Sequence, residues 1–180
     1  MPNLLMRKLL LVVFLAPAAP LLAQNVLPTA TPYPTYRASF GLLANPKALG
    51  IQAETRFRQP FGARLTVAQS FDYRPRESGG AAIGLLTYYL PLRNPRIEPM
   101  VGIGTVYSLY RWDTGYDKGT LTDLNLGGGL GVNLRFNANF RTGISLLAAN
   151  NFEAAYSEGT MRVVRRRLLV MPALTFDVLF

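Results

Sequence analysis

The chain has 180 residues, a formal net charge of +9, 49% hydrophobic residues and neither histidine nor cysteine. This length corresponds to a single domain. The absence of histidine and cysteine excludes Ser-His-Asp triads, thiol nucleophiles, and imidazole or thiolate metal sites. The positive charge is not accompanied by a nucleic-acid-binding motif. We therefore expect a chain with no catalytic residues, no metal, no cofactor and no nucleic-acid partner, that is, not an enzyme.

Residues 1–23 have the three-part pattern of a secretory signal peptide. Arg7 and Lys8 are followed by the apolar run Leu9–Leu15 and by a small-residue exit that ends at Ala23. The alternative is a membrane anchor, but the run is interrupted by prolines and is shorter than the roughly 20 residues that span a bilayer. We expect export and cleavage near Ala23, followed by a Pro-rich leader over residues 24–35.

From residue 36 onward the hydrophobic period is two, which is the period of a β-strand. Eight strands are expected, over residues 36–43, 50–57, 63–73, 81–90, 97–110, 122–136, 140–149 and 166–180. The odd-numbered connections grow to 11 residues (111–121) and 16 residues (150–165), whereas the even-numbered ones are short. Long loops at one end and short turns at the other are typical of an outer-membrane barrel.

The alternation does not by itself say which face meets solvent. In the sixth expected strand, Leu124, Leu126, Leu130 and Val132 share one face, and glycine, asparagine and Asp123 share the other. An eight-stranded barrel is only just wide enough inside for its side chains, so the bulky apolar face must point outward. The sequence therefore predicts an all-β, eight-stranded antiparallel transmembrane barrel over residues 36–180. A secreted, lipocalin-like carrier with the apolar face inward is the less favoured alternative.

Aromatic residues are expected to form girdles at the two membrane interfaces. One girdle comprises Phe57, Phe61, Tyr89, Phe136, Phe140 and Phe180, and the other comprises Phe71, Tyr73, Tyr107, Tyr110 and Trp112. Charged residues on the inner face must be paired, since an unpaired buried charge is costly. We expect a lumen-plugging network of Arg37, Glu54, Arg56, Arg64, Asp72, Arg135, Arg141, Arg167 and Asp177.

The signal peptide, the alternating strands and the terminal TFDVLF resemble the small bacterial outer-membrane barrels of the OmpA/OmpX-like family. The resemblance implies that Leu174, Phe176, Val178 and Phe180 form the signal read by the barrel-assembly machinery. Pro172 departs from the pattern because it cannot donate a ladder hydrogen bond. It predicts a bulge, or regular pairing of the last strand from about Ala173.

The last long connection ends in a cluster of arginines. If it faces outward, Arg162, Arg165 and Arg166 lie near lipopolysaccharide phosphates, and a solvated loop base without a ligand is an equally weighted alternative. We expect a monomeric protein of the Gram-negative outer membrane, with lipid and lipopolysaccharide as partners. Its expected role is structural or surface-interacting, through the third and fourth loops. A narrow pore for small solutes is the alternative.

Overall fold

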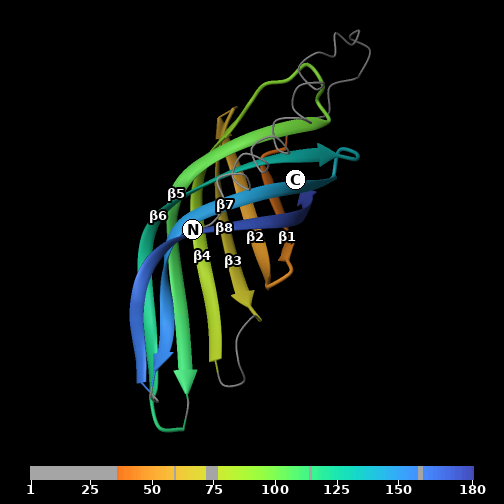
Figure 1. Cartoon of the computed structure of the whole chain (residues 1–180). Helices are drawn as coiled ribbons and strands as arrows, with labels where there is room; N and C mark the ends of the chain where they lie inside the picture. Colours follow the sequence, from red (N-terminus) through yellow and green to blue (C-terminus); the bar gives the residue numbers. More distant parts are fainter. Residues whose placement is uncertain (1–35, 59, 72–76, 114, 158–159) are drawn as a thin grey trace, which may run out of the picture. The chain divides into compact units, whose positions relative to one another are not determined.

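The structure is a computed structural model that describes residues 36–58, 60–71, 77–113, 115–157 and 160–180. The expected signal peptide (1–23) and Pro-rich leader (24–35) lie outside the described residues. The described chain contains eight strands and no helix long and apolar enough to cross a membrane (Figure 1). The strands are β1 (Ala38–Asn45), β2 (Ala48–Arg58), β3 (Phe61–Ser70), β4 (Glu77–Tyr89), β5 (Ile97–Asp113), β6 (Lys118–Arg135), β7 (Phe140–Ser157) and β8 (Thr160–Leu179).

Each strand pairs antiparallel with its neighbours in the chain, and β1 pairs with β8 to close the barrel. The closing ladder runs from Ser39↔Leu179 to Ala44↔Leu174. Closure removes the free sheet edge along this part of the wall. The predicted eight-stranded antiparallel barrel is confirmed.

The two-residue period sends large apolar side chains to the outer surface and small or polar ones inward. In β6, Leu126 is 77% exposed, whereas Asn133 is 3% exposed. The same alternation places Leu65 and Val67 of β3 on the outer surface of the barrel and the buried Arg64 on its inner face. The outer surface of the barrel is therefore apolar, and its interior is polar at one end.

The connections differ from the expected pattern of long and short loops. β5 continues to Asp113 and β6 begins at Lys118, so the third connection is a tip of four residues rather than eleven. The fourth connection is residues 158–159, because β7 continues to Ser157 and β8 begins at Thr160. The expectation of long third and fourth loops is wrong. Where the β5–β6 and β7–β8 ladders continue beyond the apolar part of the barrel, their backbone hydrogen bonds persist, but apolar and polar residues no longer alternate. The sequence of these segments therefore resembles that of a loop.

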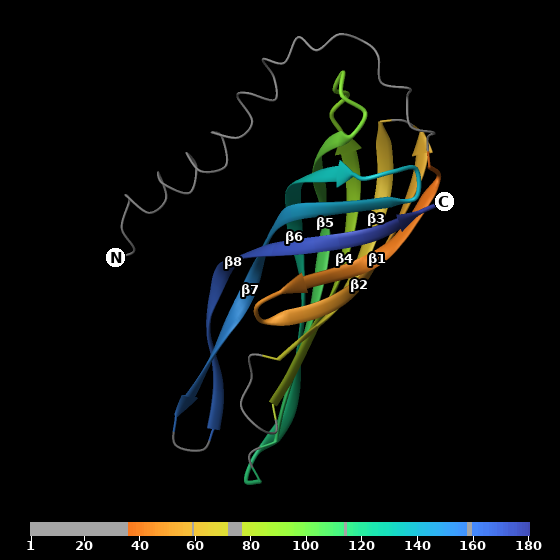
Figure 2. The ribbon, with the colours of Figure 1, turned by 90° about the vertical axis from the view of Figure 1, so that its right-hand side faces the viewer.

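The strands also differ in length around the barrel. β1 to β3 have 8, 11 and 10 residues, whereas β5 to β8 have 17 to 20. The β6–β7 ladder stops at Gly127↔Ala149, although β5–β6 and β7–β8 pair far beyond that level. Figure 2 shows these two hairpins separating as they leave the barrel. We call this end the hairpin end, and the end with connections 59–60, 90–96 and 136–139 the turn end.

Pro172 lies just beyond the closing ladder. Pairing of β8 with β1 starts at Leu174, whereas pairing with β7 continues through Leu146↔Pro172 without a register shift. The irregularity of this hairpin lies instead between Glu153 and Ala154. The expectation of a bulge at Pro172 is wrong. Regular pairing from about Ala173 is confirmed only on the side of β8 that faces β1, because pairing with β7 begins at Thr160.

Glycine at position 104 is required by a close approach of two strands. A Cβ atom built there would overlap the carbonyl group of Gly84. We expect Gly104→Ala to lower the free energy of unfolding by about 1–3 kcal/mol, because the overlap is with backbone that must shift. Gly84→Ala is the matched control, since its Cβ would lie 3.9 Å from the nearest atom, Oγ1 of Thr105. Urea unfolding in lipid vesicles, followed by fluorescence of the single tryptophan, measures both, and equal effects would contradict this packing argument.

Candidate functional site

A cluster of charged residues fills the inside of the barrel at the turn end. Strand register brings its members together, because Glu54 is opposite Arg64, and Arg141 is opposite both Arg135 and Asp177. All five are buried. Residues paired across strands share one face of the sheet, so the cluster follows directly from the barrel topology.

Glu54 is at the centre of the cluster. Its Oε2 accepts hydrogen bonds from Nη2 of Arg64 at 2.7 Å, Nη2 of Arg141 at 3.0 Å and the Tyr89 hydroxyl at 2.5 Å. The Nε of Arg56 lies 3.5 Å from Oε1. Donors from β3, β4 and β7 thus converge on one carboxylate of β2.

Arg141 links Glu54 to the rest of the cluster, and its side chain is fully buried. Its Nε donates to Oδ2 of Asp177 at 2.7 Å, and its Nη2 donates to Oγ of Ser39 at 3.1 Å. Its Nη1 donates to the Tyr36 hydroxyl and, at 3.3 Å, to Oε2 of Glu98. Gln52 supplies a second donor to Asp177, at 2.5 Å. Arg141 therefore bridges three carboxylates.

Glu98 is a member of the cluster that the sequence analysis missed. Its carboxylate lies 3.0 Å from Nη2 of Arg56, 3.3 Å from Nη1 of Arg141 and 3.8 Å from Nη1 of Arg135. Glu98 has the same parity as the buried Met100 of β5, which is the signal that identifies it as inward-facing. Its position between a turn and Pro99 obscured that parity.

Two tyrosines, also missed as site residues, pack against the arginines. The guanidinium carbon of Arg56 lies 4.0 Å from the centroid of the Tyr36 ring and 3.8 Å from that of Tyr89. Such contacts stabilise a desolvated cation. Tyr36 precedes β1, and its burial raises the pKa of its phenol well above the usual value. The phenol therefore stays protonated and donates to Glu98 at 3.2 Å.

The cluster contains four arginines and three carboxylates within ion-pair distance of one another. Breaking such a buried set by removing one partner is strongly destabilising, because it leaves a charge unpaired in a medium of low dielectric constant. The cluster joins residues of β2, β3, β5, β6, β7 and β8 across the lumen. It is therefore a cross-brace between opposite walls as well as an obstruction.

Three of the nine residues expected in the network are not part of the described cluster. Arg37 is exposed at the turn end, one residue before β1. Asp72 lies outside the described residues. Arg167 lies in β8, opposite Asn151, and its side chain is not described.

Beyond the cluster, the inner face of the barrel carries smaller polar residues and then apolar ones. Thr66, Thr87, Asn133, Ser145 and Thr175 are buried in the next layer. An apolar group packs above them inside the barrel, formed by Leu43, Ile83, Leu85, Val106, Leu147 and Ala173. The lumen is thus occupied by charged, polar and apolar layers in succession.

Seven of the eleven aromatic residues expected at the interfaces are exposed on the outer surface, namely Phe57, Phe61, Phe71, Tyr107, Phe136, Phe140 and Phe180. Tyr73 lies outside the described residues. Trp112 differs from the predicted girdle. It shares the inner face of β5 with the buried Tyr110, stacks on its ring at 6.0 Å, and donates from Nε1 to Asp117 at 3.1 Å. Tyr89 and Tyr110 also face inward, because their parity along β4 and β5 is that of the lumen-facing residues. Aromatic content alone does not reveal this parity.

The terminal residues expected to form an assembly signal lie on the closing strand. Leu174, Phe176 and Phe180 are exposed on the outer surface, and Val178 is half-buried there. Arg162, Arg165 and Arg166 lie within β8 rather than in a loop, opposite Ala155, Glu153 and Phe152 of β7. Their side chains are not described, so their contact with lipopolysaccharide stays a prediction.

The charged side chains of the cluster pair with one another. No group of three histidine, cysteine, aspartate or glutamate residues in the described part of the chain is arranged to hold a metal ion. Each described carboxylate of the cluster is engaged by at least one arginine or tyrosine. The ordered interior and apolar exterior define the fold class of small outer-membrane β-barrels.

Comparisons with solved structures show that this fold is shared. The N-terminal β-barrel domain of Pseudomonas aeruginosa OprF superposes with a TM-score of 0.63 at 13% identity, over 81% of this chain and 100% of that one. Neisserial surface protein A (NspA) gives 0.56 at 14% identity, over 79% and 93%. P. aeruginosa outer membrane protein OprG gives 0.50 at 12% identity, over 78% and 93%. No protein-family model and no curated protein sequence matches the chain.

Removing the bridging arginine tests the cluster. We expect Arg141→Met to lower the free energy of unfolding by about 3–5 kcal/mol, because it leaves Glu54 and Asp177 buried without their shared cation. The control is Arg111→Met, which removes an exposed arginine of β5 and should change the free energy by less than about 0.5 kcal/mol. Denaturant titration of the folded barrel in vesicles measures both, and equal effects would argue against a brace.

Proposed function

We propose that this protein is an integral outer-membrane barrel with a structural or surface-interaction role. The observation that carries the proposal is the inverted distribution of its side chains. Arg141 and Asp177 are 0% exposed, whereas Leu130, Ile144 and Ile103 lie on the outer surface. In water this arrangement would expose a continuous apolar belt, whereas in a bilayer it exposes that belt to hydrocarbon.

The closed strand ladder supports the same proposal. In hydrocarbon every backbone N–H and C=O group must be bonded within the protein, and a closed barrel achieves this. The turn end would face the periplasm, with the C-terminal strand ending there. The longer hairpins β5–β6 and β7–β8 would extend outward from the cell.

A surface role is supported by the tip of the β5–β6 hairpin. Tyr116 is 99% exposed and follows Gly115, whose φ of 85° allows the chain to reverse tightly. The tip also presents Asp113 and Lys118, which line a pocket together with Gly115, Tyr116 and Asp117. We propose that this tip and the β7–β8 hairpin provide the contact surface that the sequence placed in loops.

Two further parts of the proposal rest on sequence and position. The outward-facing Phe180, Phe176 and Leu174 would be read by the barrel-assembly machinery during insertion. The arginine cluster of β8, which includes Arg162, Arg165 and Arg166, would contact lipopolysaccharide phosphates through bidentate guanidinium groups. We propose that both interactions involve a monomeric barrel.

Membrane insertion is tested on the outward face of β6. We expect Leu130→Arg to destabilise the inserted barrel by about 2–4 kcal/mol, the cost of a cation in the middle of the hydrocarbon. The control Thr122→Arg lies on the same face nearer the hairpin end and should cost about 0–1 kcal/mol. The assay is folding into phospholipid vesicles, followed by the change of gel mobility on heating. A soluble chain that tolerates both variants equally would refute the proposal.

The closed lumen is tested by electrical recording. We expect the folded protein in planar bilayers to show no large, stable openings, because the charge cluster and the apolar layer above it occupy the lumen. Protein-free bilayers with matched detergent provide the control. Large and stable single-channel steps would instead support the alternative function, a narrow pore for small solutes.

A further inference from the structure

Charge is distributed unequally between the two ends of the barrel. At the turn end, Arg37, Arg93 and Arg96 are exposed. The side-chain carboxylates described at that end, Glu54, Glu98 and Asp177, all lie in the internal cluster with arginine partners. Among the described residues, the exposed side chains of the turn-end rim are therefore basic.

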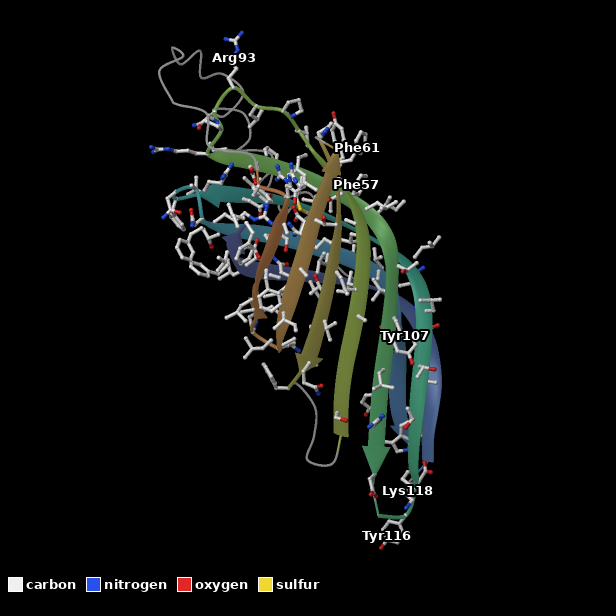
Figure 3. The ribbon with its side chains drawn as sticks, turned by 180° about the vertical axis from the view of Figure 1, so that it is seen from behind. Phe57, Phe61, Arg93, Tyr107, Tyr116 and Lys118 are labelled. Atoms are coloured by element: carbon white, nitrogen blue, oxygen red, sulfur yellow. The ribbon has the colours of Figure 1, made fainter. Side chains whose placement is uncertain are left out.

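The hairpin end has mixed charge. Its described residues include Asp113, Asp117 and Asp123 as well as the cations Lys47, Arg111 and Lys118. Figure 3 shows Arg93 at the same end as Phe57 and Phe61, and Tyr116 and Lys118 at the far end. Among the residues whose side chains are described, exposed or half-buried aspartates therefore accompany the cations at the hairpin end, whereas no exposed acidic side chain accompanies those at the turn end.

The rim adjoins the edge of the outer apolar belt. The backbone N–H of Arg37 donates to the carbonyl of Phe180 at 2.7 Å, and the Phe180 side chain is 70% exposed. The carbonyl of Arg96 accepts from the backbone N–H of Arg135 at 2.7 Å, next to the exposed Phe136. Arg37 and Arg96 therefore lie where aromatic side chains end and lipid headgroups would begin.

The geometry points to a lipid-binding rim, in which Arg37, Arg93 and Arg96 bind the phosphate groups of anionic phospholipids in the leaflet at the turn end. Guanidinium groups bind phosphate oxygens in a bidentate manner. Basic residues beside a bilayer attract anionic headgroups within a Debye length. The inference rests on the proposed function, since it requires an inserted barrel.

The spacing of the arginines around the barrel favours a bilayer over a compact acidic partner. Arg37 lies beside β2 and β8, Arg96 lies beside β6, and Arg93 lies in the β4–β5 connection. A ligand that contacts all three must surround the barrel, and annular lipid does so. The excess of one arginine in the internal cluster adds to the positive potential at this end.

The test measures lipid selectivity of the full-length protein in phosphatidylcholine membranes that contain spin-labelled phosphatidylglycerol or spin-labelled phosphatidylcholine. Electron paramagnetic resonance gives the relative association of each label with the barrel. We expect the wild type to prefer phosphatidylglycerol severalfold, and the preference of R37Q/R93Q/R96Q to approach one. The preference should also fall at high salt, because the charges are exposed.

Two matched variants separate charge from packing and position. R37K/R93K/R96K keeps the charge and should keep most of the preference, and K47Q/R111Q/K118Q removes three cations from the hairpin end and should leave it unchanged. R37Q/R93Q provides a second neutralised variant that should lose a smaller part of the preference.

Three outcomes would overturn the inference. The first is an unchanged preference for phosphatidylglycerol in R37Q/R93Q/R96Q, and the second is an equal loss of that preference in K47Q/R111Q/K118Q. The third is displacement of the labelled phosphatidylglycerol by inorganic phosphate beyond that by chloride at equal ionic strength, which would indicate a free-phosphate site. A wild-type chain that fails to enter the membrane would instead refute the proposed function.

Discussion

The structure depends on the pairing of charges inside a barrel too narrow to hydrate them freely. Arg141 contacts Glu54, Asp177 and Glu98, and these residues come from four different strands. The desolvation cost of each group is offset only while all partners are in place. The interaction therefore ties the register of opposite walls to one arrangement, because a one-residue slip of any strand would turn its charged residue toward the outer surface.

The same constraint divides the barrel into two functional regions. Near the turn end all eight strands form a continuous wall around the charged cluster. Toward the hairpin end β6 and β7 separate above Gly127 and Ala149, whereas β3 to β6 stay paired with one another and β7 stays paired with β8. The barrel wall is closed around the internal ion pairs and opens between β6 and β7 beyond them. The closed part would be rigid, and two groups of paired strands project from it. The projecting strands are thus separated from the region that contains the internal ion pairs.

Much of this organisation could be predicted from the sequence, and the failures have physical causes. Strict alternation around Leu130 and Asn133 identified both the strand and its faces, because one face is apolar along its length. The ends of β5 and β7 were missed because hydrogen bonding continues where apolar alternation stops. Glu98 and Tyr89 were missed as partners of Arg56 and Glu54, since cross-barrel contacts depend on register between distant strands, and a single strand's pattern contains no register information.

The closing ladder also determines the order in which the barrel can fold. Every other ladder joins strands that follow one another in the chain and requires only a hairpin. The β1–β8 ladder joins Ser39 to Leu179, so it closes a loop that contains nearly the whole domain. Contacts of such high sequence separation are slow to form. Until they form, the backbone edges of β1 and β8 are unpaired, so the open sheet is the species most exposed to aggregation during biogenesis.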